Sequence, residues 1–98
     1  MKIEFDSEDM EDLATKTKFD RKYQTGIGKA YRKRLKLIIA AENSTDLRAM
    51  TSFRFEKLGG SRKGEYSIRL NIQWRLIVEL KENNSEEIIL IKSIEDYH

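Results

Sequence analysis

The spacing of the hydrophobic residues changes once along this 98-residue chain, and the change limits the folds that it can adopt. Before about residue 50 the apolar side chains recur every three or four positions, as on helices. From Ser52 onward they alternate with polar ones, as on strands. A chain of this length has room for one hydrophobic core, which both halves must share. The sequence therefore predicts one α+β domain over residues 1–98, with helices packed on one face of a sheet.

The residues before Gly26 predict a short strand and one helix. Lys2–Phe5 alternates between polar and apolar side chains, as an exposed strand does. Ser7 is a typical N-cap, because it precedes several acidic residues that favour a first helical turn. We therefore expect a strand at Lys2–Phe5 and a first helix from about Ser7 to about Tyr23.

A second helix is expected after the glycines at 26 and 28, and its two sides differ in character. One side carries four apolar residues at helical spacing: Ile27, Tyr31, Leu35 and Ile38. The other side carries four basic residues, here called the basic ridge: Lys29, Arg32, Lys33 and Lys36. At 100° per residue these sets lie on opposite faces, so the helix should bury one and present the other to solvent. A further helical turn is expected within Asn43–Met50.

The second half of the chain predicts a curved, mainly antiparallel sheet. Strands are expected at 53–57, ending at Gly59-Gly60, then at 66–71 and 74–80, and finally at 88–91 after a polar loop at 81–87. The middle two form a hairpin with one packed face, and Arg69 and Arg75 lie on its other face. The last strand is apolar on both faces, which is typical of a central strand. With the N-terminal strand, the sheet should contain four to five strands.

Composition excludes several classes of protein. The chain has no cysteine and one histidine, which excludes disulfides and argues against a zinc site. It has no apolar run that could span a bilayer and no pattern typical of a secretory leader, so we expect a cytoplasmic protein without membrane contact. No motif for a nucleotide or metal cofactor is present, and none is expected.

The charges are segregated although the net charge is only +2. Residues 1–20 carry seven acids and three bases, whereas residues 21–38 carry seven bases and no acid. Residues 51–80 are again basic, and residues 81–98 are acidic. Such segregation can create a positive face that binds a polyanion, although charge alone is equally consistent with a solvated helix face.

Few residues remain as candidates for chemistry. The glycine-rich stretch Gly59–Gly64 lies between strands, so it is interpreted as a basic hairpin loop in which Ser61 is a turn residue. The C-terminal Glu95–His98 and the arginines Arg62, Arg69 and Arg75 are left. Judged from the residues alone, His98 is a frayed terminal residue.

The stretch Leu58–Arg75, which reads LGGSRKGEYSIRLNIQWR, resembles the HigB plasmid-maintenance killer proteins of the RelE/ParE toxin superfamily. Their pattern contains a leucine and a glycine, an arginine, a Ser-Ile-Arg strand and an aromatic-arginine pair, and it ends in Asp-Tyr-His. This chain has Trp74-Arg75 and, after an apolar strand, Asp96-Tyr97-His98. About forty residues match closely, and the helical half agrees in its order of elements.

The resemblance implies a RelE-like fold and a toxin of a type II toxin–antitoxin system that cleaves mRNA in the ribosomal A site. The expected reaction is attack of a ribose 2′-hydroxyl on its own 3′-phosphate, which needs a base, an acid and a cation. The resemblance assigns Arg75 to the phosphate, and His98, Tyr97 and Asp96 to proton transfer, base stacking or orientation. The expected RNA-binding residues are Lys57, Arg62, Lys63, Arg69 and, toward 16S ribosomal RNA, Lys29, Arg32, Lys33 and Lys36. The implied protein partner is a helix-turn-helix antitoxin of the HigA type, bound at the helical half and including the acidic stretch Glu8–Asp12.

This chain departs from the family pattern at two positions. Gly59 stands where the family commonly has lysine, and Glu56 stands where some members have histidine. Lys57 and Lys63 are near enough in sequence to supply the missing charge, and Glu56 is either a base or an exposed strand carboxylate. Two alternatives remain open: a non-catalytic RNA- or ribosome-binding module, and a superfamily relative with another target.

Overall fold

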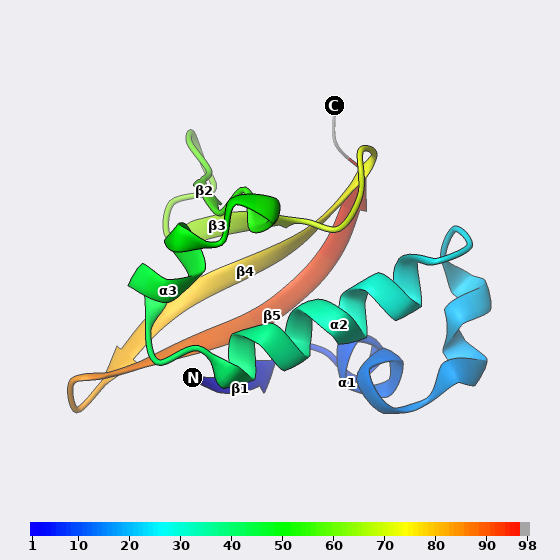
Figure 1. Cartoon of the computed structure of the whole chain (residues 1–98), viewed down its shortest axis with the longest axis horizontal. Coiled ribbons are helices and arrows are strands. Elements are labelled where there is room, and N and C mark those ends of the chain that lie inside the picture. The colour runs from blue at the N-terminus through cyan, green and yellow to red at the C-terminus, as the bar shows by residue number, and fades with distance from the viewer. Residues whose placement is uncertain (97–98) are drawn as a thin grey trace.

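The computed structural model describes residues 1–96, which form helices on one side of a five-stranded sheet (Figure 1). The elements are β1 (Lys2–Phe5), α1 (Glu8–Thr15), the 3₁₀ helix η1 (Thr17–Lys22), α2 (Ile27–Ala40), α3 (Ser44–Ala49), η2 (Thr51–Phe53), β2 (Glu56–Lys57), β3 (Glu65–Arg69), β4 (Trp74–Asn83) and β5 (Glu86–Asp96). No helix within these residues has the length and hydrophobicity that a membrane crossing requires.

The strands lie in the order β1-β5-β4-β3-β2. β1 pairs with β5 in parallel, and the other neighbours are antiparallel. The expected mainly antiparallel sheet is thus confirmed, and so is the central position of Ile88–Ile91, which lies within β5 between β1 and β4. In Figure 1 β4 and β5 are the two long curved strands, and the α2 ribbon runs below β4 in this view.

The core lies between α2 and the sheet. The four residues of the expected apolar stripe are buried, together with Ile68, Leu76 and Val78 from the hairpin and Ile89 and Ile91 from β5. Because successive strand residues point to opposite faces, Ser67, Arg69, Arg75 and Ile77 lie on the other side of the sheet, here called the open face. The hairpin prediction, with Arg69 and Arg75 on the face opposite the core, is therefore confirmed.

The single first helix predicted at Ser7–Tyr23 is wrong. α1 ends at Thr15, Lys16 has an extended backbone with φ −131°, and η1 follows. The cause is tertiary, because Asp20 of η1 forms two 2.8 Å hydrogen bonds with the guanidinium of Arg32 on α2. A side chain at Gly28 would overlap the Asp20 carboxylate, so glycine is what allows this close approach.

Two predictions about the sheet also need correction. The strand expected at 53–57 is reduced to Glu56–Lys57, because Arg54 has a left-handed φ of 45° that interrupts an extended chain. The polar loop expected at 81–87 is instead the end of a long hairpin. Its tight turn is made by Asn84 and Ser85, whose φ values of 52° and 67° fit a type I′ turn.

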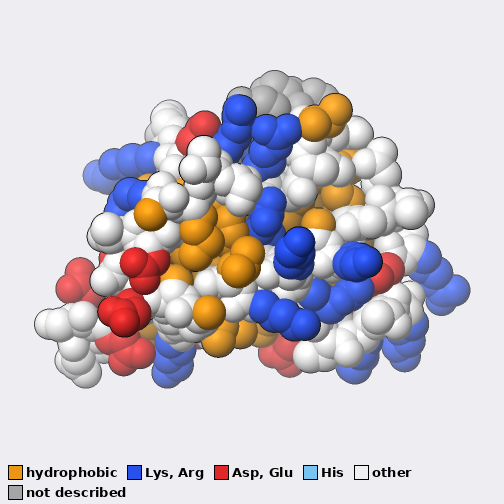
Figure 2. All heavy atoms as spheres, in the orientation of Figure 1, with side chains coloured by type: hydrophobic (Ala, Val, Ile, Leu, Met, Phe, Trp, Pro, Cys, Tyr) orange, Lys and Arg blue, Asp and Glu red, His pale blue; other side chains and the backbone are white. Residues whose placement is uncertain are grey.

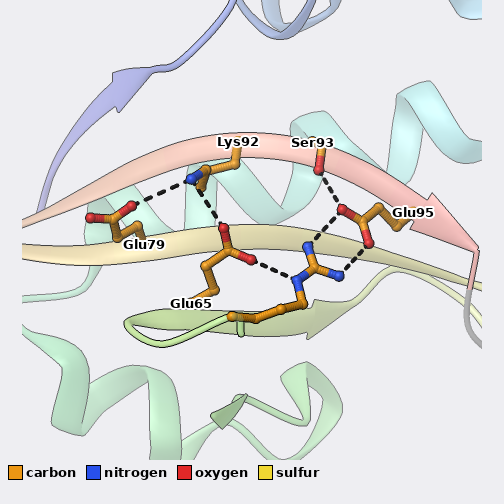
Figure 3. A network of polar contacts seen from close by, with 6 residues as sticks. Glu65, Glu79, Lys92, Ser93 and Glu95 are labelled. Atoms are coloured by element: carbon orange, nitrogen blue, oxygen red, sulfur yellow. Dashed lines mark hydrogen bonds and ion pairs between the residues drawn. The ribbon is translucent and has the colours of Figure 1, made fainter. Parts of the chain in front are cut away.

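The loop between β2 and β3 is tied to the open face by ion pairs (Figure 3). Arg62 Nη1 and Nη2 donate to the two carboxylate oxygens of Glu95 at 2.7 and 2.8 Å, and its Nε donates to Glu65 at 2.7 Å. Lys92 binds the other Glu65 oxygen at 3.0 Å and Glu79 at 3.5 Å. Glu65 and Glu95 flank β4, so the bridge crosses that strand at Ile77, which is fully buried although it lies on the open face.

One prediction concerns the buried hydroxyl of Tyr31, which donates a 2.8 Å hydrogen bond to the Met10 carbonyl and joins α2 to α1. Tyr31→Phe should lower the free energy of unfolding by about 1 kcal/mol, because one partner of a buried hydrogen bond is removed. Tyr23→Phe is the matched control, since the Tyr23 hydroxyl makes no hydrogen bond within residues 1–96. Urea unfolding measures both variants, and equal losses would refute a specific role for the Tyr31 hydroxyl.

A second prediction concerns pH. Hydrogen bonds from Arg62 hold the pKa values of Glu65 and Glu95 below their usual range. A carboxyl whose pKa is lower in the folded state stabilises the fold above its unfolded-state pKa of about 4.3 and loses that contribution as the pH falls further. Unfolding free energies between about pH 6 and pH 3 should therefore fall less in Arg62→Gln than in the parent. Parallel curves for the two proteins would contradict this account.

Candidate functional site

A cleft of about 210 Å³ opens on the open face of the sheet, beside the turn between β3 and β4. It is lined by Arg54, Glu56, Ser67, Arg69, Asn71, Ile72, Trp74 and Arg75. Three of these residues carry a guanidinium group and one carries a carboxylate, so the cleft is positive. Planar guanidinium groups form bidentate contacts with phosphate, so the chemistry of this cleft suits a phosphate ester.

The sheet register brings two of these arginines together. Arg69 of β3 lies directly opposite Arg75 of β4, and the Arg69 Nε donates to the Asn71 carbonyl at 3.3 Å. Like charges placed opposite each other on neighbouring strands destabilise a sheet. Glu95 of β5 lies opposite Arg75 on its other side and offsets part of that repulsion, and an anion bound in the cleft would offset more of it.

Glu56 and Ser67 form the next row of the cleft, because Glu56 of β2 pairs with Ser67 of β3. Glu56 is exposed and Ser67 is buried. A carboxylate that faces a positive cleft can accept a proton from a substrate hydroxyl, provided that the substrate lies within hydrogen-bond distance. Glu56 therefore has the position that a base would need, on the strand next to Arg69.

The C-terminal strand forms the neighbouring row. Glu95 lies opposite Arg75, and Asp96 lies opposite Trp74, where its Oδ2 accepts a 3.4 Å hydrogen bond from Gln73 Nε2. Asp96, predicted as a catalytic residue, does not line the cleft, and strand alternation places it on the side of β5 away from Arg75. Tyr97 and His98, the other two residues of the predicted triplet, lie outside the described residues.

The predicted RNA-binding residues fall into three places. Arg69 lines the cleft together with Arg75. Arg62 lies in the loop between β2 and β3, where two glutamates bind its guanidinium. Lys57 and Lys63 are exposed and do not line the cleft.

The basic ridge is on the helical layer, across the sheet from the cleft. Its lysines are exposed, whereas Arg32 is partly buried in its pair with Asp20. Figure 2 shows this side of the molecule, with Lys and Arg side chains over the region where Figure 1 places α2. The ridge borders an apolar groove of about 600 Å³ between α1, α2 and β1, lined by Ile3, Phe5, Ala14, Thr15, Lys29, Arg32, Lys33, Leu35, Lys36 and Ile39.

Sequence reasoning missed several residues of the cleft wall. Arg54 enters the cleft because its left-handed backbone interrupts the expected strand, and no pattern in the sequence indicates that conformation. Asn71 was detectable, because asparagine favours turns in which its side chain binds following backbone groups. Its Oδ1 accepts the backbone N–H groups of Gln73 and Trp74 at 2.8 and 2.7 Å. Ile72, at the tip of this turn, is 84% exposed, which is unusual for a large apolar side chain.

The chemistry that the cleft offers is that of arginine, carboxylate, hydroxyl and amide groups. Among residues 1–96, no three His, Cys, Asp or Glu side chains are grouped so that they could bind a metal ion. Trp74 also borders the cleft, but it follows the alternation of β4 onto the helix-covered side, where its Nε1 donates to Gln24 Oε1 at 3.1 Å and its side chain packs against the core.

The chain is similar to known proteins in sequence and in fold. The family described as "RelE-like toxin of type II toxin-antitoxin system HigB" matches residues 3–98. Toxin HigB-1 of Vibrio cholerae serotype O1 is 37% identical over 79 residues, which cover 81% of this chain and 83% of that protein.

Two solved structures share the fold. A YoeB/ParE toxin from Agrobacterium tumefaciens superposes with a TM-score of 0.65 at 17% identity and full coverage of both chains. YafQ from E. coli superposes with a TM-score of 0.65 at 17% identity, covering 96% of this chain and 90% of that one. The family match and the sequence relative, together with this shared fold, place the chain among the HigB-like toxins of type II toxin–antitoxin systems, within the RelE superfamily.

Proposed function

We propose that this toxin is an endoribonuclease that cleaves mRNA on the ribosome and that the scissile phosphate binds in the cleft on the open face. The observation that carries the proposal is the pair Arg69 and Arg75, opposite each other on neighbouring strands and lining the cleft. Such a pair supplies the charge that a pentacoordinate phosphorane needs during in-line attack. The exposed Ile72 supplies apolar surface for a flanking base.

The proposed reaction is a transfer within the RNA. The ribose 2′-oxygen attacks the adjacent phosphorus, the bond to the 5′-oxygen breaks, and a 2′,3′-cyclic phosphate is formed. A base removes the 2′-hydroxyl proton and an acid protonates the leaving 5′-oxygen. Glu56 is the candidate base within the described residues, since it lines the cleft. As the family resemblance implies, His98 and Tyr97 are assigned to the acid step and Asp96 to their orientation.

The first test of the proposal is removal of the arginine charge. Arg75→Ala should lower the rate of RNA cleavage by at least about 10²-fold, because it removes a cation from the phosphorane. Arg21→Ala is the matched control, since Arg21 is an exposed arginine of η1 in the helical layer. Primer extension on a translated reporter transcript measures cleavage, and equal activity of the two variants would refute the site.

The same assay tests the C-terminal residues 96–98 and the candidate base Glu56. His98→Ala, Glu56→Ala and deletion of residues 96–98 should each remove discrete cuts within codons. Growth inhibition that survives all three changes but is abolished by charge reversal of the basic ridge would instead support a non-catalytic ribosome-binding module.

Membership of a toxin–antitoxin family implies an antitoxin. We propose that a HigA-type antitoxin inserts an acidic amphipathic helix into the apolar groove between α1, α2 and β1. The groove lining is mostly apolar and includes Ile39, which is 55% exposed, while the lysines of the ridge border it. An apolar floor with a basic rim complements a helix that has one apolar and one acidic face. The acidic stretch Glu8–Asp12 on neighbouring α1 is expected to contribute to the same interface.

We further propose that the ridge lysines contact 16S ribosomal RNA phosphates when the toxin is free. The ridge and the cleft lie on opposite sides of the sheet, so a helix in the groove would leave the cleft open. Inhibition would then follow from blocked ribosome docking. In this proposal the helical side binds the ribosome and the open face cleaves the mRNA. Such an arrangement suits a cytoplasmic toxin whose substrate is bound to a ribosome.

Two variants distinguish antitoxin binding at this surface from ribosome binding. Ile39→Asp should weaken copurification with the product of the adjacent gene, because it places a charge in the apolar groove, and should leave ribosome cosedimentation unchanged. Lys33→Glu/Lys36→Glu should weaken both, and its ribosome binding should depend less on salt, because fewer counterions are released. A double exchange that cosediments like the parent at every salt concentration would show that the ridge is solvated surface.

A further inference from the structure

Arg54 is an exposed arginine of the cleft lining, and within residues 1–96 its guanidinium makes no hydrogen bond or ion pair. In contrast, Arg32 and Arg62 are paired with carboxylates, and neither of them lines the cleft. The proposed reaction uses Arg69 and Arg75 for the scissile phosphate and assigns nothing to Arg54. Its guanidinium is therefore available for a second anionic group of the same ligand.

The backbone leaves the sheet at Arg54, just before the short edge strand β2 (Figure 1). Beside β2, the Leu58 N–H donates to the Glu65 carbonyl of β3 at 2.9 Å, and hydrogen-bonded pairs recur at every second position of an antiparallel ladder. Extended in the same register, this ladder would pair Arg54 with Arg69. A continuous strand would therefore bind the Arg54 N–H to the Arg69 carbonyl.

Two other hydrogen bonds take the place of that pair. The Arg54 N–H donates to the Thr51 carbonyl at 3.2 Å, and the Arg69 carbonyl accepts a 2.9 Å hydrogen bond from Arg34 Nε. The Arg34 guanidinium also lies over the ring of the fully buried Phe53, 5.1 Å from its centroid. The break in the ladder is thus stabilised from two sides, by η2 and by α2.

The conformation of Arg54 is strained, because a left-handed φ of 45° is unfavourable for any residue with a side chain other than glycine. Strained residues of this kind concentrate at functional sites. A continuous strand would place Arg54, Arg69 and Arg75 in one row on three neighbouring strands, where like charges repel. The break removes Arg54 from that row, while its side chain still lines the cleft. Positive charge is thus spread along the cleft, as a chain of phosphates requires.

We propose that Arg54 binds the RNA phosphate next to the scissile one, so that the cleft holds two consecutive phosphates. The inference rests on the proposed ribonuclease function and adds a second binding position to it. A contact with a phosphate that does not react is equally strong in the ground state and in the transition state. Its loss should therefore raise KM and leave kcat nearly unchanged.

The first test measures binding of a short single-stranded RNA in which 2′-fluoro groups replace the hydroxyls, so that it cannot be cleaved. Arg54→Gln should weaken binding about tenfold and reduce the slope of log K against log salt concentration by about 0.7, the value for one phosphate contact on a single strand. Arg54→Lys should keep the slope. Arg21→Gln, the matched control on η1, should bind like the parent. An unchanged affinity and slope in Arg54→Gln would overturn the proposal, and so would a parent that does not bind this RNA.

The second test identifies the phosphate. One phosphate at a time is replaced in the probe by an uncharged methylphosphonate, with the cut position taken from primer extension. Replacement next to the cut should weaken binding to the parent but have little further effect on Arg54→Gln, because the partner of that phosphate is already missing. Coupling to the scissile phosphate alone, or to no phosphate, would overturn the proposal.

Arg54→Gly separates RNA binding from folding. Glycine adopts a positive φ readily, so this variant should unfold at a temperature no lower than the parent while it loses RNA affinity as Arg54→Gln does. A lower unfolding temperature would indicate a structural role for the Arg54 side chain and overturn the proposal.

Cleavage kinetics on ribosomes that carry the reporter transcript separate failure of this proposal from failure of the proposed function. Arg54→Gln and Arg54→Gly should raise KM about tenfold and keep kcat within about threefold of the parent. A parent that cuts the transcript, with an unchanged KM in both variants, would overturn the role of Arg54 alone. A parent that shows the expected binding pattern but cuts no RNA would refute the nuclease function alone.

Discussion

The long antiparallel pairing of β4 with β5 determines where almost every other feature lies. Its register runs from Trp74 opposite Asp96 to Asn83 opposite Glu86, with one irregularity near Ile77 and Val78. Because side chains alternate between the two faces, a slip by one residue would move Arg75 to the helix-covered face and carry Leu76 out of the core. The buried residues of this pair thus fix the position of the cleft as firmly as they fix the fold.

The same pairing explains how a nearly neutral chain can carry two separate positive regions. The sheet separates two groups of basic residues. Arginines lie on its open face, and the basic ridge lies on the helices that cover its other face. The domain thus has two positively charged regions on different sides of a single core. Acidic residues offset some of these charges by forming ion pairs, such as Asp20 with Arg32 and Glu95 with Arg62.

Periodicity in the sequence predicted the elements that contact the core only through a row of apolar side chains. The four core residues of α2 and the alternation of the β3–β4 hairpin fall in this class. Periodicity did not predict the split of the first helix, because the split depends on contacts of Asp20 with Arg32 and Gly28 of α2. Arg62 is paired with Glu65 three residues away and with Glu95 33 residues away, and no local pattern could indicate the second, bidentate pair.

The candidate site shows the same limit. Family resemblance directed attention to Arg75, which lines the cleft, and to Asp96, which lies on the neighbouring strand but does not line it. Arg54 and Ile72 escaped notice because their roles come from a backbone angle and from exposure, neither of which leaves a periodic signal. Arg69 and Arg75, two like charges opposite each other, also lower the stability of the sheet. Replacement of Arg69 by a neutral residue is therefore expected to relieve the sheet of one of two opposed charges, whatever the role of that residue in the cleft.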